Sequence, residues 1–218
     1  MRKGSIIFVV FLAIVIIGGS VRADTDRCAD AVKEGKFRDA IVICTKQIEG
    51  GAGGKHSAVY RNRGIAYLET GQSDLAIADF SKALGLNPNE EETYNDRGAA
   101  YLGKGWTESA IGDFSRAIRL NPKNAEPYRN RGAAHMADRR FDAARDDFQK
   151  AVELDPADSR GYYNMACLYS LQKNDRESCS WLQKAIDHGY SNWGHLKQDP
   201  DLEHVRNEEC YRAIVKGK

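Results

Sequence analysis

Apolar and polar residues follow a helical spacing through most of the chain, and the pattern repeats every 34 residues. Three consecutive segments, 57–90, 91–124 and 125–158, carry apolar residues at intervals of three and four. Two such stretches in each segment predict two amphipathic helices. A repeat of this length predicts a solenoid, in which each unit packs on its neighbours. We therefore expect an all-α fold built from helix pairs.

Seven positions of the repeat hold the same or a similar residue in all three segments. Small residues, which let helix axes approach closely, stand at positions 8, 20 and 27: Gly64, Gly98, Gly132, Ala76, Ala110, Ala144, Ala83, Ala117 and Ala151. Residues that fill the remaining volume stand at positions 4, 11 and 24: Tyr60, Tyr94, Tyr128, Tyr67, Tyr101, His135, Phe80, Phe114 and Phe148. Proline at position 32 (Pro88, Pro122, Pro156) follows Asn or Asp and ends the second helix, because the residue before proline is disfavoured in a helix.

This arrangement of marked positions resembles the tetratricopeptide repeat. The resemblance spans about residues 27–215 and is most specific over 57–158. It implies two antiparallel helices per unit, stacked as a right-handed superhelix with a concave groove lined mainly by the first helix of each pair. An arginine at position 7 and an aspartate at position 23 accompany each other, which predicts internal pairs: Arg63 with Asp79, Arg97 with Asp113, and Arg131 with Asp147.

Residues 1–23 have the three parts of a secretory signal peptide. Arg2 and Lys3 precede a continuous apolar run over residues 6–17, and small residues at positions 21 and 23 suit cleavage after Ala23. An uncleaved membrane anchor is the alternative, since residues 5–21 are uncharged. We expect export to a bacterial periplasm or cell envelope, with a membrane as partner only if this segment is retained.

Charge argues against nucleic acid as a partner. Loss of Arg2, Lys3 and Arg22 with the leader would leave 29 basic residues against 31 acidic ones, and a nucleic-acid binder would need a basic face.

Residues 24–56 form a degenerate first repeat followed by a glycine-rich connector. Aligning Ala40 with position 20 puts Cys28 at position 8 and Cys44 at position 24, one step along from the arginine and aspartate positions. Facing positions of an antiparallel hairpin have a nearly constant sum, so we predict a Cys28–Cys44 disulfide in an oxidising compartment. Two buried thiols are the alternative.

Residues 159–192 form a divergent fourth repeat, and residues 193–218 a C-terminal cap. Position 32 of this repeat is Tyr190 in place of proline. Cys167 pairs with Cys179 by the facing rule, but Cys179 with Cys210 is a rival that the sequence leaves open. Asp199 and Pro200 predict a helix start within the cap. No two-residue Cys or His spacing indicates a zinc site, and we expect no metal and no cofactor.

The resemblance places the ligand against the first helices of the pairs. Asparagine or aspartate at position 6 is suited to contacting the backbone of an extended peptide. The predicted groove residues are Arg61, Asn62, Ile65, Asn95, Asp96, Ala99, Arg129, Asn130, Ala133, Tyr163 and Asn164. The tetratricopeptide subtype that holds chaperone C-termini has Lys at position 5 and Asn at position 9 of its first repeat, whereas this chain has Arg61 and Ile65 there.

These observations predict a non-enzymatic interaction protein. The histidines are scattered, and no nucleophile elbow, phosphate loop or HExxH motif occurs. The expected function is an adaptor for a protein or peptide of unknown identity. The alternative is a self-associating structural module, in which exposed ends or Cys210 join copies of the chain.

Overall fold

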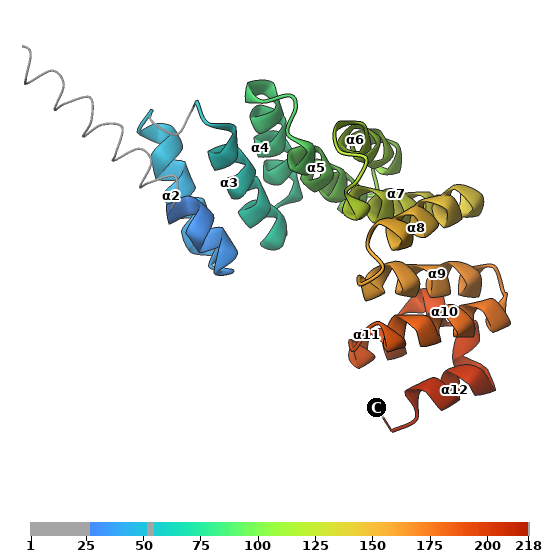
Figure 1. The fold of residues 1–218 in the computed structure, drawn as a ribbon. Coiled ribbons are helices and arrows are strands. Elements are labelled where there is room, and N and C mark those ends of the chain that lie inside the picture. Colours follow the sequence, from blue (N-terminus) through green and yellow to red (C-terminus); the bar gives the residue numbers. More distant parts are fainter. Residues whose placement is uncertain (1–26, 52–54, 218) are drawn as a thin grey trace, which may run out of the picture. The chain divides into compact units, whose positions relative to one another are not determined.

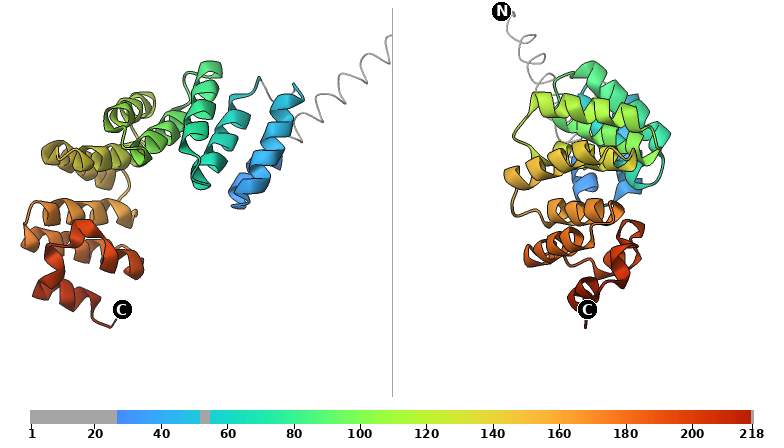
Figure 2. Two further views of the ribbon diagram at one scale, coloured as in Figure 1. Left: turned by 180° about the vertical axis from the view of Figure 1, so that it is seen from behind. Right: turned by 90° about the vertical axis from the view of Figure 1, so that its right-hand side faces the viewer.

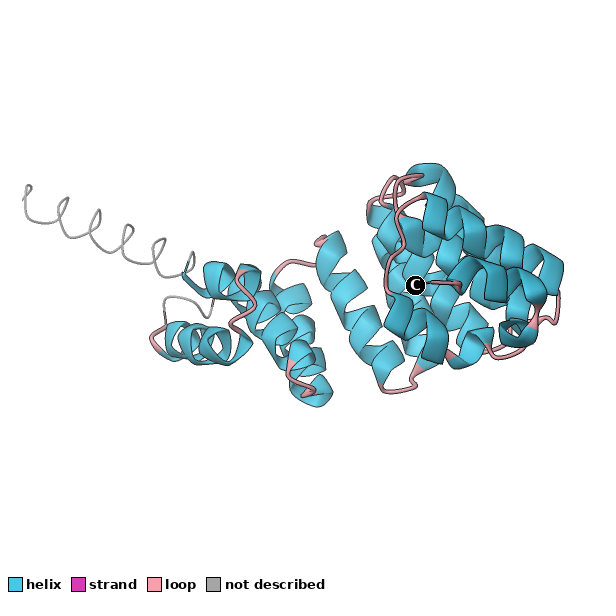
Figure 3. Cartoon of the chain, turned by 90° about the horizontal axis from the view of Figure 1, so that it is seen from below, coloured by secondary structure: helices cyan, strands magenta, loops and turns pink. Residues whose placement is uncertain are grey.

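The computed structural model describes residues 27–51 and 55–217, and every regular element within those ranges is a helix (Figure 3). The fold is therefore all-α, as the repeat pattern predicts. The chain divides between Lys104 and Gly105 into two compact units. Residues 1–23, where the signal peptide is predicted, lie outside the described residues. No helix among the described residues combines the length and the apolar character that crossing a membrane requires.

The first unit contains the degenerate repeat and the first regular one. Residues 27–33 are helical and precede α2. Its further helices, labelled in Figure 1, are α2 (Phe37–Glu49), α3 (Ser57–Glu69), α4 (Ser73–Leu86) and α5 (Glu91–Gly103). Helix α3 packs against α2 and α4, and α4 packs against α5. Each helix thus contacts its neighbours in sequence, as expected of stacked helix pairs.

The second unit continues the same arrangement and ends in the cap (Figure 2). Its helix pairs use α6 (Thr107–Leu120), α7 (Ala125–Ala137), α8 (Phe141–Leu154), α9 (Ser159–Leu171) and α10 (Asp175–Asp187). The cap comprises α11 (Trp193–Gln198), the 3-10 turns η1 (Pro200–Leu202) and η2 (Val205–Asn207), and α12 (Glu209–Val215). Leu202 and Val205 of the cap are fully buried in one cluster with Leu182 of the last repeat.

Glycine at position 8 is required by the phenylalanine at position 24. A Cβ on Gly64 would lie 2.7 Å from Phe80 Cε1, and one on Gly132 would lie 2.6 Å from Phe148 Cδ1. In the first repeat these two positions are Cys28 and Cys44, whose sulfur atoms are 2.02 Å apart. The disulfide therefore occupies the place of the glycine–phenylalanine contact.

The arginine at position 7 connects three helices. Arg63 donates from Nε and Nη2 to Asp79, with N–O distances of 2.7 and 2.8 Å, and from Nη1 to Thr45 of the preceding repeat. Arg131 contacts Asp147 in the same way and reaches Ser115 of the preceding repeat. The predicted pairs Arg63–Asp79 and Arg131–Asp147 are thus present, but the hydroxyl partner at position 25 was not anticipated.

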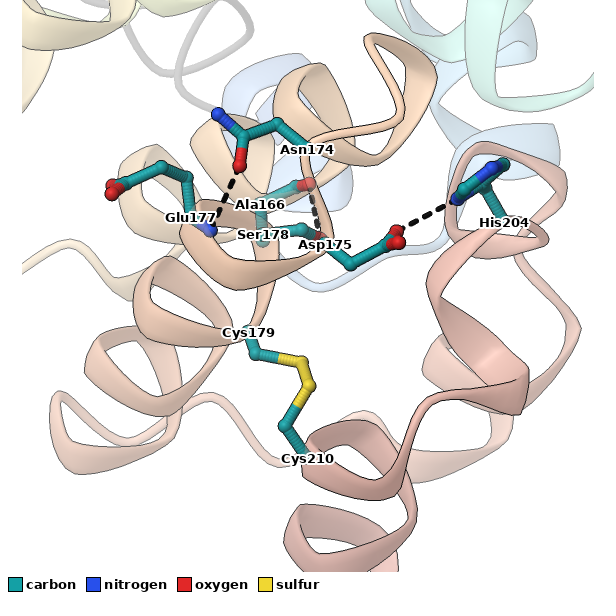
Figure 4. The surroundings of a disulfide bond; sticks show 8 residues. All are labelled: Ala166, Asn174, Asp175, Glu177, Ser178, Cys179, His204 and Cys210. Carbon is teal, nitrogen blue, oxygen red and sulfur yellow. Dashed lines mark hydrogen bonds and ion pairs between the residues drawn. A yellow bond between two sulfur atoms is a disulfide. The ribbon is translucent and has the colours of Figure 1, made fainter.

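The pairing of the last three cysteines is settled by the structure. Cys179 of α10 is bonded to Cys210 of α12, with sulfur atoms 2.05 Å apart (Figure 4). Cys167 is the free, buried cysteine. The alternative Cys167–Cys179 pairing is therefore wrong, and Cys210 is engaged within its own chain instead of linking copies. His204 Nδ1 lies 2.7 Å from Asp175 Oδ1, which is a second contact between the cap and α10 (dashed line in Figure 4).

The cap begins as the first helix of a fifth repeat. Helix α11 starts at Trp193, which is 34 residues after Ser159, the first residue of α9. It ends after six residues, because Pro200 follows at position 8 and proline has no N–H for a helical hydrogen bond. Asp199 does cap the next element by accepting from the Asp201 N–H, but that element is a 3-10 turn. The predicted helix start, with Asp199 as the cap and Pro200 as the first helical residue, is thus present.

The turn between the two helices of each pair uses a left-handed backbone conformation at position 15. Glycine supplies it in three repeats, at Gly35, Gly71 and Gly105, whereas Arg139 and Lys173 adopt φ values of 57° and 60° in the last two. A side chain in this region costs about 1–2 kcal/mol relative to glycine.

We therefore expect Lys173→Gly to raise the free energy of unfolding by about 1 kcal/mol, measured by urea denaturation. The control is Gln149→Gly, because Gln149 is exposed inside α8. That change should destabilise by a similar amount, since glycine is a poor helix former. A destabilised Lys173→Gly variant would contradict the argument.

Candidate functional site

In the first unit, the predicted groove residues differ strongly in accessibility. Arg61 of α3 and Asp96 of α5 form an ion pair, with Nε and Oδ2 2.7 Å apart. Asn95 is only 6% exposed, and Ile65 packs against the core cluster that contains Phe80. Asn62 is partly exposed and makes no hydrogen bond to any residue that the structure describes. Ala99 is partly buried on α5. The side-chain amide of Asn62 is thus accessible to a ligand.

In the second unit, three predicted residues come together. Arg129 of α7 and Tyr163 and Asn164 of α9 line one pocket of about 470 Å³. Two predicted residues are not among its lining: Asn130 is partly buried, and Ala133 packs against the cluster around Phe148. The pocket lining is completed by Ser159, Arg160, Gly189, Tyr190, Ser191, Asn192 and His195.

Arg129 is held in the pocket wall by long contacts only. Its side chain is 15% exposed, its Nε lies 3.5 Å from Asp158 Oδ2, and its Nη2 lies 3.8 Å from Glu126 Oε1. The Nε atom is buried and makes no hydrogen bond within the described structure. Burial lowers the pKa of Arg129, and the neighbouring charge of Arg160 lowers it further. The positive charge of Arg129 is therefore only partly balanced by the nearby carboxylates.

Tyr163 forms a fixed aromatic wall. Its hydroxyl donates to Asp199 Oδ2 at 2.6 Å and lies 3.3 Å from His195 Nδ1. Its ring stacks on Tyr190 with centroids 4.2 Å apart. Burial raises the pKa of Tyr163 far above the ordinary value, and Cys167 and Asp199 act in the same direction, so the hydroxyl remains a donor.

Cys167 lies behind this wall. Its sulfur is 3.8 Å from Asp199 Oδ2, and burial raises the pKa of the thiol well above its ordinary value. A thiol that stays protonated is a poor nucleophile. Cys167 is thus a packing residue of the wall.

Residues at the junction of the fourth repeat and the cap complete the pocket, and sequence reasoning did not assign them to the site. Tyr190, Asn192 and His195 precede or belong to α11. The signal was the 34-residue spacing, which places Trp193 at the start of a further first helix. Extending the repeat beyond residue 192 would have indicated that this segment packs beside α9.

Nowhere in the described part of the chain do three or more His, Cys, Asp or Glu side chains gather closely enough to hold a metal ion.

Family comparison identifies the repeats directly. Three family models, each described as tetratricopeptide repeat, match residues 57–90, 95–159 and 147–186. Together they cover more than half of the 218 residues. No curated protein sequence matches the chain.

Solved structures with the same fold cover most of the chain. PilF of Pseudomonas aeruginosa is 16% identical, with a TM-score of 0.74 over 91% of this chain and 90% of that one. MamA from Desulfovibrio magneticus RS-1 is 18% identical, with a TM-score of 0.68 over 77% and 94%. YrrB, described as a TPR protein with an unusual peptide-binding site, is 20% identical, with a TM-score of 0.61 over 76% and 84%. At these identities the likeness concerns the fold.

Proposed function

Because the chain belongs to the tetratricopeptide repeat family, we propose that it is a non-enzymatic adaptor that binds a peptide or protein segment along the first helices of its pairs. Proteins with these repeats generally mediate protein–protein interaction, and YrrB, a similar fold, is described as having a peptide-binding site. These first helices are α3 and α5 in the first unit, and α7 and α9 in the second.

The observation that carries this proposal is the accessibility of the side-chain amides of two asparagines at position 6. Asn62 and Asn164 are partly exposed, and neither side-chain amide makes a hydrogen bond to the described residues. An amide offers both donors and an acceptor, which suits the backbone of an extended peptide. Each of these two amides could therefore contact the backbone of a bound peptide within its own unit.

We place this adaptor in the bacterial periplasm or cell envelope. Two disulfide bonds, Cys28–Cys44 and Cys179–Cys210, support an oxidising compartment. Residues 1–23 would then act as the leader that directs export.

A pull-down from a bacterial envelope extract tests the proposal. The variant Asn62→Ala/Asn130→Ala/Asn164→Ala should lose a protein that the unmodified chain retains. The matched control is Lys82→Ala/Gln149→Ala/Arg176→Ala, which alters three exposed residues on second helices and should retain it. Thermal unfolding verifies that both variants are folded. Equal retention by both variants would place the binding surface elsewhere.

A further inference from the structure

We propose that the Cys179–Cys210 bond is a redox-sensitive switch: a dithiol cleaves it at Cys210, and the wall of the pocket beside α9 then loosens. This pocket contains Arg129, Tyr163 and Asn164 of the predicted groove. The consequence for ligand binding therefore rests on the proposed function, whereas the loosening of the wall does not. The bond and the pocket both lie in the second unit.

The two cysteines of this bond differ in accessibility. Cys210 is exposed on α12, whereas Cys179 is only 6% exposed on α10 (Figure 4). An incoming thiolate therefore reaches the Cys210 sulfur more readily. Cys28 and Cys44 of the first disulfide are both fully buried, which protects that bond from the same attack.

Cleavage is a thiol–disulfide exchange that consumes one dithiol. One thiolate of the dithiol attacks the Cys210 sulfur and forms a mixed disulfide with it, while Cys179 leaves as a thiolate and takes a proton from water. The second thiolate of the dithiol then attacks the dithiol's own sulfur in the mixed disulfide and releases Cys210, which is protonated in turn. The two cysteines gain two electrons and two protons, and the dithiol becomes a disulfide.

The helix that carries Cys210 depends on this bond. Helix α12 has only seven residues, which is too short for a stable isolated helix. It packs against α10 and η2, and the disulfide joins its second residue covalently to α10. Cleavage removes this covalent constraint, so α12 detaches in a larger fraction of the molecules.

Tyr211 connects α12 to the pocket wall. Its side chain is buried, and its hydroxyl donates to the Leu196 carbonyl oxygen of α11 at 3.0 Å. The adjacent His195 belongs to the wall, because its Nδ1 lies 3.3 Å from the Tyr163 hydroxyl and 3.2 Å from the Tyr190 hydroxyl. Detachment of α12 removes the Tyr211 hydrogen bond and part of the packing around Leu196. The wall is then less rigid, and a less preorganised site binds its ligand more weakly.

Cys167 provides a reporter of the wall inside the protein itself. It is 2% exposed and belongs to the same hydrophobic cluster as Tyr163, Leu196 and Tyr211. A thiol-specific reagent such as N-ethylmaleimide reaches it only in molecules in which this cluster has opened locally. The rate of labelling at Cys167 therefore measures how often the wall opens.

Labelling of the full chain with N-ethylmaleimide tests the inference. The variant Cys179→Ala/Cys210→Ala lacks the bond and adds no thiol. We expect Cys167 to be labelled at least about tenfold faster in it than in the unmodified oxidised protein, measured by mass spectrometry. The matched control is Cys28→Ala/Cys44→Ala, which lacks the other disulfide and should leave this rate unchanged.

The variant Tyr211→Phe tests the connection while the disulfide remains intact. It removes the hydroxyl that donates to Leu196 and should raise the labelling rate of Cys167 about fivefold. Circular dichroism verifies that each variant is folded. Tyr211→Phe alone decides the connection if Cys179→Ala/Cys210→Ala does not fold.

Dithiothreitol is the dithiol probe for the cleavage step. A limited amount, removed by gel filtration before N-ethylmaleimide is added, should open the Cys179–Cys210 bond of the unmodified protein and leave Cys28–Cys44 intact. The faster labelling of Cys167 should appear in the same molecules.

An unchanged labelling rate of Cys167 in a folded variant that lacks the Cys179–Cys210 bond, or in Tyr211→Phe, would overturn the switch. Neither measurement involves a ligand. Faster labelling combined with a partner that the asparagine variant still retains in the pull-down would refute the proposed groove and leave the switch standing. The two proposals therefore fail separately.

Discussion

Replacing Gly132 by alanine is expected to lower the free energy of unfolding by about 2–3 kcal/mol, although alanine is normally the better helix former. The added Cβ would lie 2.6 Å from the ring of Phe148, which is fully buried. A ring enclosed on all sides cannot move without displacing its neighbours, and overpacking of this kind is costly. Urea denaturation followed by circular dichroism measures the change.

Gly112 provides the matched control within the same unit. It lies inside α6, and a Cβ there would meet nothing within 4 Å. Gly112→Ala should therefore stabilise by about 0.5–1 kcal/mol. Adding Phe148→Leu to Gly132→Ala should restore part of the lost stability, because the smaller side chain leaves room for the methyl group. Stabilisation by Gly132→Ala would refute the close-contact explanation.

Removing the N-terminal disulfide by Cys28→Ala/Cys44→Ala is expected to cost about 3 kcal/mol, the value for a loop of this length. Both cysteines are fully buried, and their separation is 16 residues. Among the described residues, the first repeat packs against a neighbouring repeat on one side, through α2 and α3, so its helices depend on this bond. Hydrogen exchange should become faster across residues 27–49 than across α9 and α10.

The second disulfide is the control for that result. Cys179→Ala/Cys210→Ala should loosen α12 and leave the exchange of residues 27–49 unchanged. Mild reductant should also open Cys179–Cys210 first, because Cys210 is exposed whereas Cys28 and Cys44 are not. Mass spectrometry after thiol alkylation gives the order. Simultaneous reduction of both bonds would mean that burial does not protect the Cys28–Cys44 bond from the reductant.

The repeats were predictable because each marked position has one physical role. The Phe148 ring leaves no room for a Cβ at position 132, and Arg131 donates a hydrogen bond to Asp147 across the hairpin. Such pairs recur at fixed spacing, so the sequence pattern predicts the helices, their pairing and the first disulfide partner positions.

The site was less predictable because it depends on local differences between equivalent positions. Arg61 and Arg129 have the same place in the repeat, yet Arg61 donates to an aspartate at 2.7 Å, whereas Arg129 lies 3.5 Å from one. Tyr163 lies on the predicted face, but its hydroxyl donates to Asp199 of the cap and its ring stacks on Tyr190 at the end of the fourth repeat. The choice between Cys167 and Cys210 as the partner of Cys179 likewise depended on how the cap folds back.

The six-residue helix α11 acts as a chain terminator for the repeat array. Stacked repeats are open-ended, since the last pair always presents a surface that another pair would fit. Here Trp193 begins that next pair, Pro200 stops it, and the Cys179–Cys210 bond fixes the remainder in place. A further helix pair therefore cannot stack on this end of the array. Lengthening the protein in evolution would consequently require inserting repeats before residue 159 and keeping the terminator last.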